Sequence, residues 1–161
     1  MKVAVIGATG LVGKQIIQLL ASRNFPVSEL ILAASDKSTG KSIRFQNTDQ
    51  VVVSIDEALS MKPQLAIFSA GAEVSLEYAP KFADMHCRVI DNSSAWRMDV
   101  QKKLIVPEVN ADVLQESDYI IANPNCSTIQ MVLPLQVFEK CYGLSKVIVS
   151  TYQSVSGSVL S

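Results

Sequence analysis

Short apolar runs alternate along this chain with longer segments in which apolar side chains recur every three to four residues. The first pair is a strand expected at Lys2–Ile6 and a helix expected at Leu11–Arg23, which Asn24-Phe25-Pro26 ends. Further strands are expected at Leu30–Ala34, Leu65–Ala70, Cys87–Asp91 and Tyr119–Ala122, and helices at Asp56–Met61, Glu73–Met85 and Cys126–Cys141. This alternation predicts an α/β fold with a doubly wound, mostly parallel sheet.

Four segments depart from the alternation. Ser42–Phe45 and Val51–Ser54 are predicted to be short strands that pair antiparallel, and Asn92–Asn110 is predicted to be a long irregular stretch. Leu144–Ser154 is predicted to be a strand that begins a new unit. We therefore expect a first domain over residues 1–125 and an incomplete second domain over residues 126–161. An unpartnered apolar strand favours self-association, so a homo-oligomer is expected.

Composition narrows the class of protein. The 161 residues amount to one domain or slightly more, and 48% of them are hydrophobic, which is enough to bury a core. The formal net charge of -1 gives no general attraction to nucleic acid or to an anionic membrane, and the apolar runs are too short to span a bilayer. The N-terminus lacks the pattern of a signal peptide. The three cysteines fit neither a disulfide framework nor a metal site, so the expected location is the cytoplasm.

A glycine-rich turn joins the first strand to the first helix. Gly7 permits a tight turn, Gly10 lets the backbone approach a pyrophosphate, and Gly13 lets the helix pack closely on the sheet. The helix N-terminus then offers N–H groups to the phosphate. The position after a strand and before a helix favours a Rossmann-like dinucleotide site over a glycine-rich turn in an unrelated α/β fold.

The loop after the second strand bears on the choice of dinucleotide. It runs from Ser35 to Lys41 and includes Asp36, which would suit the ribose 2′-hydroxyl of NAD. Lys37, Ser38 and Lys41 would instead suit the 2′-phosphate of NADP, because they supply positive charge and a hydroxyl donor. We favour NADP; the alternative is a solvated polar loop without a ligand.

Cys126 follows the turn Asn123-Pro124-Asn125 and opens a predicted helix. The positive end of the helix dipole favours a thiolate there, and the N–H groups could hold an oxyanion during acyl transfer. Cys87 and Cys141 are instead expected to be small buried hydrophobic residues. The single histidine, His86, is expected on a surface turn, so the chain offers a nucleophile without an evident base.

Polar residues also follow the strand that ends at Asp91. Strand ends of this kind line the ligand crevice of an open α/β sheet. Arg97 could therefore bind a phosphate or a carboxylate as a planar fork, and the alternative is a solvent-facing arginine in a loop.

Seven ordered segments together resemble the N-terminal half of the aspartate-semialdehyde dehydrogenases. The resemblance covers nearly the whole chain and about half of a typical family member. The segments are Val5–Gly13, Ala33–Ser35, Phe68–Gly71, Asp91–Asp99, Pro107–Asn110, Asn123–Thr128 and Thr151–Gly157.

The resemblance implies NADPH-dependent reduction of aspartyl phosphate to aspartate semialdehyde and phosphate, a step toward lysine, threonine and methionine. It makes Cys126 the nucleophile that forms an acyl-thioester. It places substrate on Arg97, Asn125 and Gln153. It assigns the cofactor to Gly7, Thr9, Gly10, Leu11, Val12, Gly13, Ser35, Lys37, Ser38, Ser69, Ala70, Gly71, Ser156 and Gly157. Family members often carry arginine where Lys37 stands, so the preference for NADP is expected to be softer here.

Two features depart from the family. Relatives usually have Ser-Gly-Ala-Gly from the position of Ser156 onward. Here Ser156-Gly157 is followed by Ser158-Val159-Leu160-Ser161. The second domain, which in the family supplies the general-base histidine, a substrate arginine and most of the dimer interface, is missing from the sequence. We therefore expect the isolated chain to be inactive. The alternatives are a non-catalytic NADP-binding remnant and the related N-acetylglutamyl-phosphate reductases.

Overall fold

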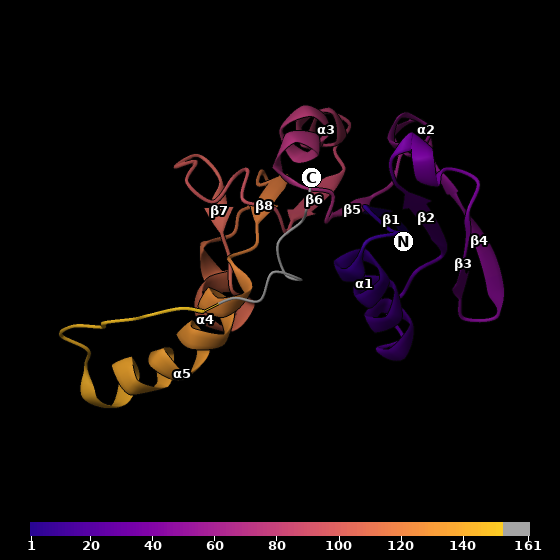
Figure 1. Ribbon diagram of the computed structural model, residues 1–161. Helices are drawn as coiled ribbons and strands as arrows, with labels where there is room; N and C mark the ends of the chain where they lie inside the picture. The colour runs from indigo at the N-terminus through magenta and orange to yellow at the C-terminus, as the bar shows by residue number, and fades with distance from the viewer. Residues whose placement is uncertain (153–161) are drawn as a thin grey trace.

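The structure is a computed structural model that describes residues 1–152. Within these residues, eight strands form one sheet in the order β3-β4-β2-β1-β5-β6-β8-β7 (Figure 1). The strands are β1 (Lys2–Ile6), β2 (Glu29–Ala33), β3 (Ser42–Phe45), β4 (Thr48–Val53), β5 (Leu65–Phe68), β6 (Arg88–Asp91), β7 (Lys103–Leu104) and β8 (Ile120–Ala122). The helices are α1 (Leu11–Ser22), α2 (Ile55–Ser60), α3 (Ala72–Asp84), α4 (Pro107–Asn110) and α5 (Cys126–Tyr142), with short 3-10 turns η1 (Asp36–Ser38) and η2 (Ala111–Val113).

The described strands pair in parallel, except for β3 and β4, which form an antiparallel hairpin. This confirms both the predicted fold class and the predicted antiparallel pair. The chain moves outward from β1 through β2 to β4, then crosses back to β5 on the other side of β1. Because the strand order reverses between β1 and β5, their carboxyl ends form the crevice where such sheets bind ligands.

Two apolar clusters lie on opposite faces of the sheet, because successive side chains of a strand point to opposite sides. α2 and α3 cover one face, where Phe82 meets Phe68 edge to face with 5.5 Å between ring centroids (Figure 1). α1 covers the other face, where Ile17 and Leu20 pack with residues such as Val5. Burial on both faces accounts for the near-continuous apolar character of the central strands.

The side chains of α1 that are buried differ from those that apolar spacing alone predicts to be buried. Gly13, Ile17 and Leu20 are its buried residues, whereas Leu11 and Val12 are 74% and 54% exposed. The first turn of α1 therefore presents two apolar side chains to solvent beside the glycine turn.

The expected irregular stretch contains more structure than its sequence indicates. Strand β7 and helix α4 both lie within it, and the short turn η2 follows directly. Val106 is the N-cap of α4 and Pro107 is its first residue, and the Asn110 side chain accepts a hydrogen bond from the Val106 N–H at 2.9 Å. Side-chain hydrogen bonds of this kind stabilise the segment. Its structure was not predicted, because the segment has no apolar periodicity.

The end of the described chain differs from the prediction. Residues 144–152 form no strand, so the strand expected at Leu144–Ser154 is wrong over that range, and residues 153 and 154 lie outside the described part. A strand needs a neighbour for its backbone hydrogen bonds, and no described strand pairs with this segment. Helix α5 extends away from the sheet, and none of its residues is buried by the described part of the chain (Figure 1).

The cysteines differ in their surroundings. Cys87 is fully buried, as expected, but Cys141 is exposed near the end of α5, so its predicted burial is wrong. Burial raises the pKa of the Cys87 thiol from 9.0 to about 12. No helix among residues 1–152 is long and apolar enough to cross a membrane.

We expect a thiol reagent such as Ellman's reagent to modify Cys126 and Cys141 in the native protein and Cys87 only after unfolding. Because the native state keeps the Cys87 proton above pH 9.0 while the unfolded chain loses it, this thiol adds stability below that pH. That stability is lost as the pH rises toward about 12. The measurement is a count of reactive thiols before and after denaturant, with Cys87→Ala as the control. Fast modification of all three native thiols would contradict it.

Candidate functional site

The glycine turn lies at the switch between β1 and β5. The N–H of Gly7 donates to the Ala33 carbonyl at 2.8 Å, and Gly7 has a φ of 88°, which favours glycine. A Cβ on Gly7 would lie 2.8 Å from the backbone of Ser69, and a Cβ on Gly13 would lie 2.2 Å from the Gly7 carbonyl oxygen. Protein packing alone therefore explains why these two positions are glycine.

Gly10 is different. Its φ of -72° suits any residue, and a Cβ there would meet only the Gly7 carbonyl oxygen, at an ordinary contact distance of 3.4 Å. Gly10 is also exposed, at the N-cap of α1. No described protein atom demands glycine at this position, whereas close approach of a phosphate to the helix N-terminus would. The turn thus fits the pyrophosphate of a dinucleotide.

A cavity of about 470 Å³ opens beside this turn. It brings together predicted residues from three segments, namely the glycine turn, the end of β2 and the end of β5. It also includes apolar wall residues that the sequence analysis missed, because α2 and α3 reach the cavity only through the fold. The lining is Gly7, Thr9, Gly10, Ala34, Ser35, Ile55, Ser69, Ala70 and Val74.

The residues beyond β5 are fixed by short contacts to β1. The Ser69 hydroxyl donates to the Ile6 carbonyl at 3.1 Å, and the Ser69 N–H donates to the same oxygen at 2.8 Å. Gly71 has a φ of 92° and caps α3. Ser69, Ala70 and Gly71 therefore follow β5 at the same edge as the glycine turn, where they were predicted to line a cofactor site.

The polar loop after β2 brings three side chains together. The Thr9 hydroxyl donates to the Ser38 hydroxyl oxygen at 3.4 Å, and the Lys41 ammonium donates to the same oxygen at 3.3 Å. Ser38 is buried. Lys37 is exposed and forms no hydrogen bond or ion pair with the rest of residues 1–152.

Three strand ends are joined by a network of amide and guanidinium groups. The Asn92 side-chain amide donates to the Phe68 carbonyl at 2.9 Å, and the Asn123 amide donates to Asn92 Oδ1 at 2.7 Å. Arg97 Nε donates to the Asn123 carbonyl at 3.0 Å, and its Nη2 donates to the Asn92 carbonyl at 2.8 Å. Arg97 is therefore anchored at the ends of β6 and β8 rather than free in solvent.

The loop that carries Arg97 is held at two further points. Asp91, fully buried, accepts from the Ser93 hydroxyl at 2.6 Å and from the Ser93 N–H at 3.2 Å. The Trp96 indole N–H donates to the Ser75 hydroxyl on α3 at 2.8 Å. These bonds satisfy the buried polar groups and fix the path of the loop.

Cys126 is the first residue of α5 and is exposed. The preceding Asn125 is the N-cap, and its side-chain oxygen accepts from the Ser127 N–H at 3.0 Å and from the Ser127 hydroxyl at 2.6 Å. The Cys126 sulfur lies 4.0 Å from the same oxygen. The predicted position of the thiol at the start of a helix after β8 is therefore confirmed.

His86 and the Cys126 thiol lie at opposite ends of the parallel strands. It is exposed, precedes β6 and contacts the Tyr119 hydroxyl through Nδ1 at 3.2 Å, whereas Cys126 follows the carboxyl end of β8. Parallel strands β6 and β8 place these two positions at opposite edges. Gln153, Ser156 and Gly157 lie outside the described residues. Within residues 1–152, no group of three or more His, Cys, Asp or Glu side chains could hold a metal ion.

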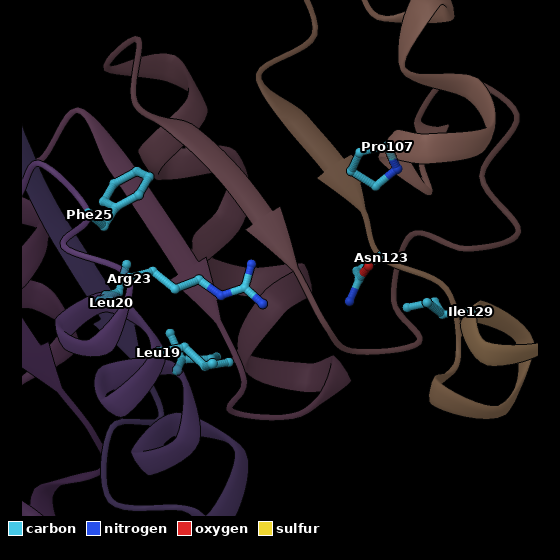
Figure 2. A pocket seen from close by; sticks show the side chains of 8 residues that line it. Leu19, Leu20, Arg23, Phe25, Pro107, Asn123 and Ile129 are labelled. Carbon is cyan, nitrogen blue, oxygen red and sulfur yellow. The ribbon is translucent and has the colours of Figure 1, made fainter. Parts of the chain in front are cut away.

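A second cavity, of about 650 Å³, lies between α1 and the junction of β8 with α5. Figure 2 shows the Arg23 side chain extending across it toward Asn123. Its lining is mostly apolar and consists of Ile16, Leu19, Leu20, Arg23, Phe25, Pro107, Asn123 and Ile129. No residue predicted to bind cofactor or substrate lines this cavity.

Relatives of this chain are semialdehyde dehydrogenases. Aspartate-semialdehyde dehydrogenases of Aquifex aeolicus and Bacillus subtilis are 49% and 48% identical over 98% of this chain, matched to 47% and 46% of their own lengths. The chain thus spans about half the length of these curated relatives.

Comparison with solved structures leads to the same group of enzymes. Aspartate semialdehyde dehydrogenase II of Vibrio cholerae, complexed with ASA, superposes with a TM-score of 0.84 at 44% identity, over 88% of this chain and 47% of that one. The Candida albicans enzyme with NADP superposes with a TM-score of 0.72 at 25% identity, over 89% and 48% of the two chains. The family model for the NAD binding domain of semialdehyde dehydrogenases matches residues 2–117. The chain therefore belongs to the semialdehyde dehydrogenase family, whose NAD-binding domain it carries.

Proposed function

We propose that this chain is the nucleotide-binding half of an aspartate-semialdehyde dehydrogenase that reduces aspartyl phosphate with NADPH. The observation that carries the proposal is that the glycine-turn cavity and the exposed Cys126 both lie at the carboxyl edge of one sheet. A dinucleotide site and a nucleophile at the same edge are what hydride transfer to an acyl-enzyme requires. The relatives from Aquifex aeolicus and Bacillus subtilis carry the name of this activity.

The chemistry divides into two steps at Cys126. The thiolate attacks the acyl carbon of aspartyl phosphate, a C–S bond forms, and the C–O bond to phosphate breaks with the electron pair leaving on phosphate. The cofactor, when bound, supplies a hydride to the thioester carbon. Hydride addition would leave an oxyanion on that carbon; its collapse re-forms the C=O bond, breaks the C–S bond, and releases the aldehyde and the Cys126 thiolate.

The chain's own residues would orient these reactants. Thr9, Gly10, Leu11 and Val12 surround the start of α1, where N–H groups and the helix dipole favour the pyrophosphate. Ser35 and Ser69 line the same cavity.

Arg97 would bind the phosphate of the substrate. Of the five N–H donors of a guanidinium group, the backbone carbonyls of Asn92 and Asn123 take one from Nε and one from Nη2. The remaining donors can bind an anion. For Asn125, the other proposed substrate residue, the support is that its side-chain oxygen lies 4.0 Å from the Cys126 sulfur. Gln153 for substrate, and Ser156 and Gly157 for the nicotinamide end, stay predictions.

The same proposal divides the molecule near residue 125. Residues 1–125 would form the Rossmann-like domain, and residues 126–161 would begin a catalytic and dimerisation domain. The support is that α5 leaves the sheet and that the described chain buries none of its residues. We also propose a homo-oligomer located in the cytoplasm, with the general base supplied outside the described residues.

The test is an enzyme assay of the full-length protein that contains this chain. The reaction is followed in the direction that forms the acyl phosphate. We expect reduction of NADP that requires both aspartate semialdehyde and inorganic phosphate. For residues 1–161 alone, we expect turnover lower by at least about 10²- to 10⁴-fold, the usual cost of losing a general base. Reduction only with N-acetylglutamate semialdehyde would favour the related reductases, and nucleotide binding without any turnover would favour a non-catalytic remnant.

A further inference from the structure

We propose that Ser75 is a positioning residue for the binding of the substrate phosphate, because it holds Trp96 and thereby the backbone that carries Arg97. The inference rests on the proposed function, since it assumes that Arg97 binds this phosphate. The Trp96 indole N–H donates to the Ser75 hydroxyl oxygen at 2.8 Å. Trp96 immediately precedes Arg97 in the chain, so this hydrogen bond joins helix α3 to the backbone from which the arginine side chain starts.

Ser75 is a firm point of attachment. It is fully buried in α3, where its N–H donates to the Gly71 carbonyl at 3.2 Å. α3 packs on β6, the strand that the arginine loop follows (Figure 1). A hydrogen bond is stronger where water is excluded, and a buried group that loses its partner is costly. The indole is therefore held to the body of the domain and not to another part of the same loop.

The residues that follow Arg97 give its backbone little support. Met98 and Val100 are 91% and 98% exposed, so their side chains add almost no packing. The Asp99 N–H donates back to the Trp96 carbonyl at 3.1 Å, which closes a turn around Arg97. Because this turn is bonded to Trp96, its position depends on where Trp96 is held.

The Arg97 backbone influences the direction in which the guanidinium group presents its remaining donors. Nε donates to the Asn123 carbonyl at 3.0 Å and Nη2 donates to the Asn92 carbonyl at 2.8 Å. The guanidinium is planar and rigid, so a shift of the backbone turns the other N–H groups away from an anion placed to meet them. Small misplacements of a substrate-binding group are costly. Neither Ser75 nor Trp96 lines the glycine-turn cavity, so we expect nucleotide binding to be unaffected.

The experiment compares Ser75→Ala with the matched variant Tyr78→Phe in the full-length protein. Both remove one hydroxyl from α3, but the Tyr78 hydroxyl donates to the Asp56 carboxylate of α2 at 3.3 Å. Steady-state kinetics would measure kcat and the KM values of inorganic phosphate, aspartate semialdehyde and NADP. For Ser75→Ala we expect the KM of phosphate to rise about 3- to 10-fold, the range for one neutral hydrogen bond. The value of kcat and the other two KM values should stay within about twofold, and Tyr78→Phe should change none of the four.

A double-mutant cycle with Trp96→Phe tests whether Ser75 acts through the indole. Phenylalanine keeps a ring but has no N–H donor, so the KM of phosphate should rise in Trp96→Phe as well, and the double variant should exceed neither single variant. Additive effects, an unchanged KM of phosphate in Ser75→Ala, or equal rises in all three KM values would overturn the assignment. If the wild-type protein showed no phosphate-dependent reduction of NADP, the proposed function itself would be wrong, and this assignment with it.

Discussion

Replacing Gly13 with alanine is expected to destabilise the protein by roughly 2 to 4 kcal/mol. The added Cβ would lie 2.2 Å from the Gly7 carbonyl oxygen and 2.9 Å from the Ala8 Cα, and both are backbone atoms that a side-chain rotation cannot clear. Overpacking of this kind usually costs about 1–3 kcal/mol or more and outweighs the gain of about 1 kcal/mol in helix propensity. α1 would have to move away from β1, which would open the core around Ile17. Urea unfolding followed by circular dichroism measures the change.

The matched control is Gly10→Ala in the same turn. Its φ of -72° accepts alanine, and the nearest backbone atom would lie at 3.4 Å, so we expect stability to change by less than about 1 kcal/mol. Nucleotide affinity should nevertheless fall, because Gly10 lines the cavity and a Cβ would obstruct the approaching phosphate. If Gly10→Ala proved to be the less stable of the two variants, the separate roles assigned to these glycines would be wrong.

Replacing Cys126 with alanine in the full-length protein is expected to abolish turnover, lowering kcat by at least about 10⁴-fold, as removal of a catalytic nucleophile does in other acyl-transfer enzymes. NADPH binding should persist, because Cys126 does not line the glycine-turn cavity. Folding should also persist, because Cys126 is exposed at the start of α5. Steady-state kinetics and mass spectrometry of the acyl-enzyme would measure the loss of turnover, calorimetry would measure NADPH binding, and circular dichroism would measure folding.

Cys141→Ala is the control for that variant. Cys141 lies near the other end of α5 and is also exposed, so its replacement tests whether any accessible thiol of this helix matters. We expect normal kcat and a normal acyl adduct on Cys126. Turnover that survives Cys126→Ala, or an adduct that forms on Cys141, would remove Cys126 from the proposed chemistry.

Residues predicted from separate motifs meet in one region because parallel strands end at one edge. The Asn123 N–H donates to the Asp91 carbonyl at 2.8 Å, and Arg97 bridges the two loops that follow. The loop of Arg97 and the turn before Cys126 are thus joined by hydrogen bonds. The side chains of Asn92 and Asn123 hold these loops together, so replacing either asparagine would shift the backbone carbonyls that anchor Arg97.

The sequence by itself determined the order of most strands and helices, the α/β class, the glycine turn and the helix start at Cys126. These features are encoded locally, by apolar periodicity and by residues close together in the chain. The sequence also predicted that the polar residues after β6 would line a ligand crevice, because strand ends do so in an open α/β sheet. The residues after β5 were assigned to the cofactor only by the resemblance.

Only the tertiary structure decided which contacts these residues make. Gly7 faces the backbone of Ser69, far away in sequence, so its role could not be separated from that of Gly10 by spacing. Lys41, whose backbone is bonded to Val52 of β4, donates from its ammonium group to the Ser38 hydroxyl oxygen. Residues 144–152 have the composition of a strand but no neighbour to pair with. In each case a contact between distant segments decides the outcome, and a local pattern does not contain that contact.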